Sequence, residues 1–342
     1  MSRQSSWVLL ANLLFLACRD TNGPPAFSGE DLGTLGTTTL ANAGLSTNSR
    51  GDWILASSGP TCPTCRLTHS FLWQNGTVTY LGALYASDLN DQGDVVGSVH
   101  FGDPEVGYDS AAHWSVGTIS YLPTLGGRSA VANGINERGA IAGSSETAAG
   151  PSHATRWVHD TAVDLGTLGG PSSANAINDS GQIVGISFTP SGVGHAFVWQ
   201  KGVMTDIGTA TQGPTDAVAI NNSGDVVGLM WSRQCPCGTD PSPPPRAVLW
   251  RQGQLIDLGT LGGTSSWATA INKAGQVVGA SLTTSGHTHA FVWQKGVMSD
   301  LGALNGVYSV ADDITDSGVV IGRSQTMDGQ IHAVRWVVPV IP

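Results

Sequence analysis

The decapeptide HAFVWQKGVM occurs twice in this chain, at residues 195–204 and 289–298. Ten identical positions, in copies that start 94 residues apart, indicate an internal repeat rather than coincidence. Such a segment is either a repeated site or a repeated piece of scaffold. His195 and His289, the first residues of the two copies, therefore have either a functional role in a site or a structural role in the fold.

The tryptophan of the decapeptide reveals the period of the repeat. It recurs at spacings of 41, 43, 42, 51, 43 and 43 residues, which defines seven repeats. The tryptophans are Trp73, Trp114, Trp157, Trp199, Trp250, Trp293 and Trp336. A supersecondary unit of just over forty residues is typical of a propeller blade.

Each repeat divides into four strand-like segments, as residues 171–208 illustrate. SANAIN is followed by the turn Asn178–Gly181, then by GQIVG, HAFVW and VMTDIG. Asn at the first and Gly at the fourth position suit a type I turn. This spacing recurs in five other repeats and becomes Thr315–Gly318 in the seventh. We therefore predict an all-β fold, a seven-bladed β-propeller of four-stranded antiparallel blades.

The two ends of the chain predict how the ring closes. Residues 31–36, DLGTLG, form an unmatched fourth strand, and the chain ends after the seventh third strand, HAVRWVV at 332–338. We expect the N-terminal strand to complete the last blade. Residues 31–342 then form a single propeller domain.

Three motifs recur in a fixed order and resemble a known family. DLGTLGG, AIN followed by GQVVG, and HAFVW are similar to the bacterial HAF extracellular repeat, and the resemblance covers residues 31–338. It implies a secreted or surface-attached protein and no particular activity. The departures are Ser110 and Arg246 in place of His, Thr315 in place of Asn and Leu55 in place of Gly.

The N-terminus predicts export. Arg3 precedes an apolar run of eleven residues, Trp7 to Ala17, which is too short to span a bilayer but fits a signal-peptide core. Ala17-Cys18 resembles a bacterial lipoprotein processing site, although Phe15 stands where Leu is usual. We predict a lipoprotein-type signal peptide over 1–17, lipidation at Cys18, a linker over 18–30 and a location in the cell envelope, at the outer membrane, or outside the cell. An ordinary secretory signal is the alternative.

The charge of the chain limits its partners. Charged residues make up 12%, and the net charge of −10 argues against nucleic acid or an anionic membrane surface as partner. Membrane attachment is expected only through the lipid on Cys18.

The ring arrangement of the repeats favours a structural role for the repeated histidine. His stands four residues before Trp at positions 69, 153, 195, 289 and 332. Equivalent positions in different blades are spread round a ring, so they cannot converge on one metal or substrate. We expect each histidine to form hydrogen bonds within its own blade.

Connection lengths differ between the two faces of the ring. The turn between the first and second strands, and that between the third and fourth, keep their lengths; we call the face that carries them the turn face. From the second-strand Gly, or Leu55, to the position four before Trp is 10 residues in repeats 3, 4, 6 and 7, but 14, 13 and 18 in repeats 1, 2 and 5. The face with these connections, here the loop face, is the expected binding face.

The long connections supply the candidate ligand-binding residues. Trp231 and Trp267 flank repeats 5 and 6, and His100 and Tyr108 belong to repeat 2. Aromatic rings on a rigid rim stack on sugars, whereas local packing under a long loop is the structural alternative.

Four cysteines lie in the same connections: Cys62, Cys65, Cys235 and Cys237. In an oxidising envelope we expect a local disulfide in each loop, with a shared zinc site as the alternative.

The chain carries no G-x-S-x-G, H-E-x-x-H or P-loop, and it suggests no catalytic residue, metal or cofactor. We expect a non-enzymatic binding or scaffold module for a glycan or an extracellular or envelope protein. An envelope lyase or hydrolase acting on polysaccharide is the alternative.

Overall fold

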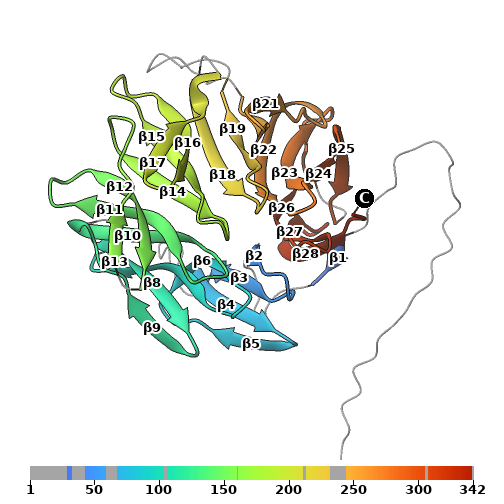
Figure 1. The fold of residues 1–342 in the computed structure, drawn as a ribbon. Helices are drawn as coiled ribbons and strands as arrows, with labels where there is room; N and C mark the ends of the chain where they lie inside the picture. Colours follow the sequence, from blue (N-terminus) through green and yellow to red (C-terminus); the bar gives the residue numbers. More distant parts are fainter. Residues whose placement is uncertain are drawn as a thin grey trace, which may run out of the picture.

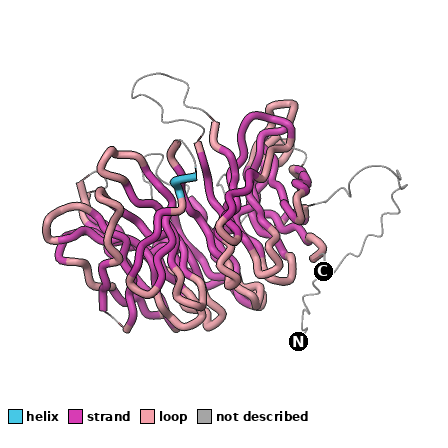
Figure 2. Tube along the Cα trace, turned by 45° about the horizontal axis from the view of Figure 1, so that its top comes forward, coloured by secondary structure: helices cyan, strands magenta, loops and turns pink. Residues whose placement is uncertain are grey.

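The computed structural model describes residues 29–32, 43–58, 68–103, 106–159, 161–210, 213–231, 244–304 and 307–340. It consists of seven four-stranded antiparallel sheets arranged in a ring (Figure 1), which confirms the predicted propeller. The first strand of each blade lies nearest the centre and the fourth lies at the rim. The only helical element in the described ranges is the short 3-10 turn η1, Gly208–Ala210 (Figure 2).

The strands of the seven blades follow the repeats. They are β2 (Ala43–Thr47), β3 (Trp53–Ser58), β4 (Thr68–Gln74) and β5 (Thr77–Tyr80) in blade 1; β6 (Tyr85–Leu89), β7 (Val95–Phe101), β8 (Tyr108–Ser115) and β9 (Thr118–Tyr121) in blade 2; β10 (Gly126–Ile135), β11 (Ile141–Thr147), β12 (Ser152–Val158) and β13 (Thr161–Asp164) in blade 3; β14 (Ser172–Ile177), β15 (Ile183–Phe188), β16 (Gly194–Gln200) and β17 (Val203–Asp206) in blade 4; β18 (Thr215–Ile220), β19 (Val226–Met230), β20 (Arg246–Arg251) and β21 (Gln254–Asp257) in blade 5; β22 (Gly262–Ile271), β23 (Val277–Thr283), β24 (Thr288–Gln294) and β25 (Val297–Gly302) in blade 6; and β26 (Ser309–Ile314), β27 (Val319–Gln325), β28 (Ile331–Val337) and β1 (Glu30–Asp31) in blade 7.

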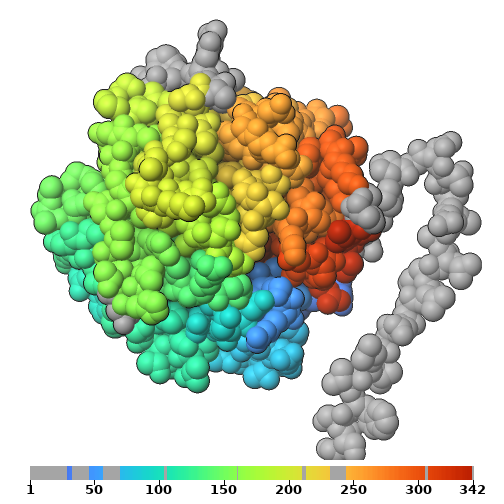
Figure 3. Space-filling model, viewed as in Figure 1, coloured from blue at the N-terminus to red at the C-terminus, as the bar shows by residue number. Residues whose placement is uncertain are grey.

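The N-terminal strand closes the ring, as predicted. β1 pairs antiparallel with β28, with Glu30 opposite Arg335 and Asp31 opposite Val334. The strand begins at Glu30, one residue earlier than the sequence motif, and residues 33–36 of that motif lie outside the described ranges. Blade 1, in blue, packs directly against blade 7, in red (Figure 3). The first and last blades are therefore joined both by packing and by a shared sheet.

The core lies between neighbouring blades. Trp199 packs with Phe197 and Ile183 of its own blade and with Leu165 and Ala142 of blade 3. Each core tryptophan that is buried in this way contributes about 4–6 kcal/mol of gross hydrophobic free energy. Two of the indole N–H groups also form hydrogen bonds with the segment that follows the preceding blade. Trp157 Nε1 donates to the carbonyl of Pro123 at 2.7 Å, and Trp250 Nε1 donates to that of Ile207 at 3.0 Å.

The conserved spacing of the second-strand glycine has a steric cause. A Cβ on Gly185 would lie 2.1 Å from the carbonyl oxygen of Ser173 in β14, so no larger residue fits beside that strand. Blade 1 carries Leu55 at this position, and there the opposing residue in β2 is Gly44, where other blades have Ala.

Candidate functional site

Four of the five motif histidines pair with the aspartate of the fourth strand in the same blade, and the side chain of the fifth, His69, lies outside the described part of the structure. Nδ1 lies 2.8–2.9 Å from the carboxylate in His153–Asp164, His195–Asp206, His289–Asp300 and His332–Asp31. Blade 5 uses Arg246 and Asp257 at 3.1 Å instead. In blades 3 to 6 the same carboxylate accepts the backbone N–H of the glycine two residues later, as Asp206 does from Gly208 at 2.8 Å. These pairs are spread round the ring and hold each outer hairpin together, which is the geometry expected of structural histidines.

The alanine of the same motif connects one blade to the next. Its N–H donates to a Ser or Thr hydroxyl at the start of the following blade. The pairs are Ala154 to Ser172, Ala196 to Thr215, Ala247 to Ser266 and Ala290 to Ser309, at 2.8–3.1 Å. With the third residue of the motif buried, as Phe197 is, all three residues of HAF serve the scaffold.

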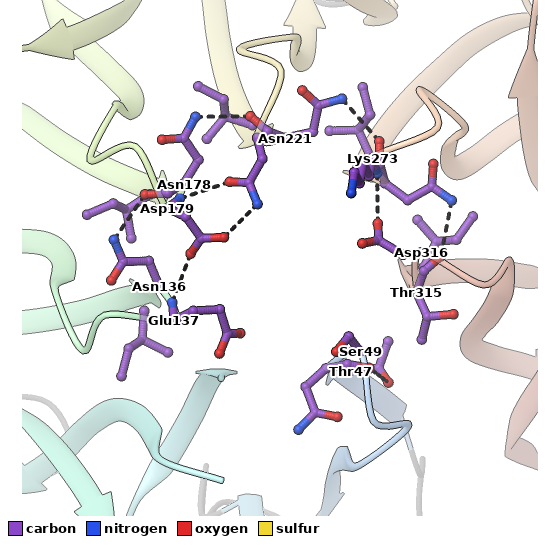
Figure 4. Close-up of a pocket in the computed structure, with 18 of the residues that line it drawn as sticks. Thr47, Ser49, Asn136, Glu137, Asn178, Asp179, Asn221, Lys273, Thr315 and Asp316 are labelled. Carbon is purple, nitrogen blue, oxygen red and sulfur yellow. Dashed lines mark hydrogen bonds between the residues drawn. The ribbon is translucent and has the colours of Figure 1, made fainter. Parts of the chain in front are cut away.

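On the turn face, the asparagines that open the turns form a ring of hydrogen bonds around the axis (Figure 4). Each side-chain amide donates to the backbone carbonyl of the equivalent residue in the next blade, at 3.0–3.5 Å, from Asn48 round to Thr315. Thr315 has no amide to continue the ring. At that junction Asp313 Oδ2 instead accepts from the Thr47 N–H at 2.8 Å and the Ser46 hydroxyl at 3.2 Å.

These turns surround a central opening of about 230 Å³ (Figure 4). The aliphatic residues that end the first strands of six blades also line it: Leu89, Ile135, Ile177, Ile220, Ile271 and Ile314. The residues that follow the asparagines and Thr315 include four acids and one lysine: Asp91, Glu137, Asp179, Asp316 and Lys273. Each carboxylate accepts a backbone N–H from the turn of the preceding blade, as Asp179 does from Glu137 at 3.0 Å. The acids are therefore used to join blades. Our sequence reasoning looked to the loop face and missed this opening, whose signal was the polar residue after each asparagine.

Two carboxyls buried near this opening share one hydroxyl. Ser46 Oγ lies 2.9 Å from Asp88 Oδ1 and 3.2 Å from Asp313 Oδ2. Burial raises the pKa of Asp88 to about 7 and that of Asp313 to about 6. A hydroxyl has one proton to donate, so the arrangement favours one protonated carboxyl at this blade junction.

Closer to the loop face, burial raises the pKa of Asp216 to about 6, and the carboxylate accepts from Asn175 Nδ2 at 3.0 Å.

The structure places Trp231 and Trp267 on adjacent blades. Trp231 follows β19, and its backbone N–H donates to the Pro214 carbonyl at 3.0 Å. Trp267 lies within β22, opposite Ala280. Both side chains are half-buried. No ring contact between them is present in the described part of the chain, so their proposed common ligand stays a prediction.

His100 and Tyr108 both lie at the base of the long β7–β8 connection but in different cross-strand pairs, His100 opposite Asp109 and Tyr108 opposite Phe101. Both imidazole nitrogens of His100 are engaged, Nδ1 with Asp109 at 3.0 Å and Nε2 with the Asp103 carbonyl at 3.1 Å. The Asp103 contact first, and the Asp109 contact second, raise the pKa of His100. His100 is thus positioned by its neighbours.

Tyr108 belongs to an aromatic cluster that our sequence reasoning identified only in part. Its ring stacks on Phe101 with centroids 5.5 Å apart, and Phe101 contacts Tyr121 edge-on at 5.5 Å. The Arg128 guanidinium lies 4.6 Å above the Tyr108 ring. Tyr121 is 54% exposed and occupies the fourth-strand position at which blades 3 to 6 carry Asp. That exchange was the sequence signal for the cluster.

Several predicted sites lie outside the described ranges: Cys18 and the segment 1–17, and Cys62, Cys65, Cys235 and Cys237. Within the described ranges no group of three His, Cys, Asp or Glu side chains is placed to hold a metal ion. The same ranges contain no helix with the length and apolar character needed to cross a bilayer.

No protein-family model and no curated protein matches this chain. Among solved structures, it is similar to the β-propeller domain of the Trilobed protease from Pyrococcus furiosus, with a TM-score of 0.61 at 9% identity over 87% of this chain and 96% of that one. That domain has an open velcro topology. The acylaminoacyl peptidase of Pyrococcus horikoshii gives a TM-score of 0.52 at 9% identity over 90% of this chain, which spans about half (53%) of the peptidase. These likenesses establish the propeller fold.

Proposed function

We propose that this protein is a secreted or envelope-attached, non-enzymatic binding module whose ligand is a glycan held on the loop face. The observation that carries the proposal is the cluster of Phe101, Tyr108, Tyr121 and Arg128 in blade 2 and at the start of blade 3. Blade 2 also has one of the three lengthened connections. The cluster therefore lies where the repeat departs from its own pattern.

The chemistry of the cluster suits a sugar ring. The half-exposed Tyr121 presents an apolar surface on which the C–H face of a pyranose can stack. Arg128 supplies N–H donors for the hydroxyl groups of a sugar. Because the rings pack on one another, little side-chain entropy is lost when a ligand binds.

The proposal is tested by screening the mature protein on a glycan array and then comparing variants on the best ligand. Tyr121→Asp restores the residue of blades 3 to 6, so the fold should persist while binding weakens at least about tenfold. Tyr80→Asp is the matched control, since Tyr80 occupies the same register position in blade 1 and its ring packs on Phe71. Equal binding by the parent and Tyr121→Asp would contradict the site.

The non-enzymatic part has its own readout. Mass spectrometry of the bound glycan after long incubation should show unchanged chain length. Shortened products would instead support the lyase or hydrolase alternative.

A further inference from the structure

Two adjoining hollows on the turn face of blades 2 to 4 form a groove with basic walls. Their volumes are about 210 and 290 Å³, and they share Arg138, Val158 and His159. The larger one is also lined by Arg156 and Lys201. We call the hollow lined by Arg138, Arg156 and Lys201 the basic groove. The chain has 15 Lys and Arg against a net charge of −10, so three cations around one groove are a local reversal of sign.

Arg156 directly precedes the core tryptophan of blade 3. Four other blades carry an apolar residue at this position, as blades 1 and 5 carry buried Leu72 and Leu249, whereas blade 7 carries Arg335. Its Nε is buried without a hydrogen-bond partner, as is that of Arg335, but no described carboxylate lies within ion-pair distance of the Arg156 guanidinium. A half-buried guanidinium with an unsatisfied N–H and no anion beside it is unfavourable unless something else supplies the anion.

Three other arginines of the propeller form ion pairs with a carboxylate. Arg251 lies 2.8 Å from Asp225, Arg323 lies 2.9 Å from Asp312, and Arg335 pairs with Glu30. In contrast, neither Arg138 nor Lys201 forms an ion pair with a described residue.

One carboxylate lines the groove, that of Asp179, and both of its oxygens are already used. Oδ1 accepts the Glu137 N–H at 3.0 Å and Oδ2 accepts Asn222 Nδ2 at 2.6 Å. Asp179 is therefore held by the neighbouring turns, and the basic groove retains room for an external anion.

We propose that the basic groove binds the carboxylate groups of an acidic polysaccharide. A guanidinium presents two parallel N–H donors that match a carboxylate, and partial burial strengthens that contact. The groove spans two blade junctions, so it suits a polymer with repeated acids better than a single small ion. The inference shares the ligand class of the proposed function, but it concerns the opposite face of the ring and different residues.

The repeat supplies matched variants for the test. Arg156→Leu introduces the residue found in blades 1 and 5, and Lys201→Gln alters an exposed side chain. Lys295→Gln is the control, because Lys295 occupies the identical position in the second copy of HAFVWQKGVM. There the preceding blade presents Leu249 and the paired Arg251 instead of Arg156.

The probes are oligogalacturonate and its methyl ester, titrated calorimetrically into the mature protein at low ionic strength. We expect the parent to bind the acid and not the ester. Arg156→Leu should weaken binding at least about tenfold, Lys201→Gln less, and Lys295→Gln less than about twofold. Melting curves confirm that the variants fold, and the surface variant Lys201→Gln keeps the test valid if Arg156→Leu does not.

Three results would overturn the inference: no binding of the acid, equal binding of acid and ester, or parent-like binding by Arg156→Leu and Lys201→Gln. Tyr121→Asp separates the two proposals. It should leave oligogalacturonate binding intact, whereas loss of that binding with Tyr121→Asp alone would place the acid on the loop face. The basic groove would then be rejected while the proposed function would stand.

Discussion

Nδ1 of His332 lies 2.9 Å from the carboxylate of Asp31, although the two residues are 301 positions apart in the sequence. Four other blades make the same kind of contact between strands joined by a tight turn. In blade 7 the contact joins the two ends of the chain. The Asp of the DLG motif and the His of the HAF motif therefore form the same pair at the ring closure as within other blades. This pair reinforces the short antiparallel ladder between β1 and β28.

Deleting residues 19–36 should lower the melting temperature and expose the edge of β28 to self-association. Asp31→Ala should have a smaller effect, about 0.5–1 kcal/mol, because the pair is partly exposed. Differential scanning calorimetry and size-exclusion chromatography measure both effects. A deletion variant that stays monomeric and melts with the parent would show that β1 is dispensable.

His195→Ala should lower the free energy of unfolding by about 0.5–1.5 kcal/mol, since the Asp206 carboxylate loses its imidazole contact and keeps the Gly208 N–H. His195→Arg should be nearly neutral, because blade 5 uses Arg246 with Asp257 in the same way. Urea unfolding separates the two variants. If His195→Ala removed ligand binding while its unfolding curve matched the parent's, the histidine would be a functional group after all.

Asn178→Ala should destabilise by about 2–3 kcal/mol, because the buried amide donates to the Asn221 carbonyl and its oxygen accepts from the Gln182 N–H. Thr315→Ala should cost less, since the junction between blades 7 and 1 depends on the Asp313 contact to Thr47. Chemical denaturation of the two variants gives the comparison. Equal losses would mean that the asparagine ring adds nothing beyond the local turn.

The stability of the propeller should fall as pH rises from about 4 to 7. Burial raises the pKa of Asp88 from 3.8 to about 7, so the folded state holds a proton that the unfolded chain releases. The stabilisation is complete below the unfolded value and is lost as pH rises through about 7, by at most about 1.4 kcal/mol per pH unit for one carboxyl. Asp88→Asn mimics the protonated form and should flatten the melting-temperature profile. A profile parallel to the parent's would exclude Asp88 as the cause.

The fold was predictable because the same four-strand pattern recurs in seven repeats. The spacing of Trp199 and its equivalents gave the blade count, and the unmatched DLGTLG gave the closure. The sequence also indicated that the histidines were structural, but not that Asp206 was their partner, because a cross-strand pair depends on register.

The sites were harder to foresee, because they lie where single residues break the repeat. Tyr121 at an aspartate position, and Arg156 at a position that is apolar in four of the other six blades, are visible in the sequence. Their neighbours are Phe101 in another strand and Lys201 in a turn of the next blade, and only the folded ring shows that they are close. The residues common to all repeats determine the structure of the blade, whereas the candidate sites are formed by residues that differ between neighbouring blades.

The two kinds of tryptophan should separate in a paired assay of melting and ligand binding. Trp199 is nearly buried between blades 3 and 4, so Trp199→Ala should cost about 3–5 kcal/mol of stability. Trp231 and Trp267 are only half-buried and lie outside the periodic series. If they contact the glycan, Ala at either position should weaken binding by roughly 1–3 kcal/mol while the melting temperature changes little. Losses of stability as large as that of Trp199→Ala would instead make them packing residues beneath the long connection of blade 5, and the glycan surface would be confined to the cluster around Tyr121.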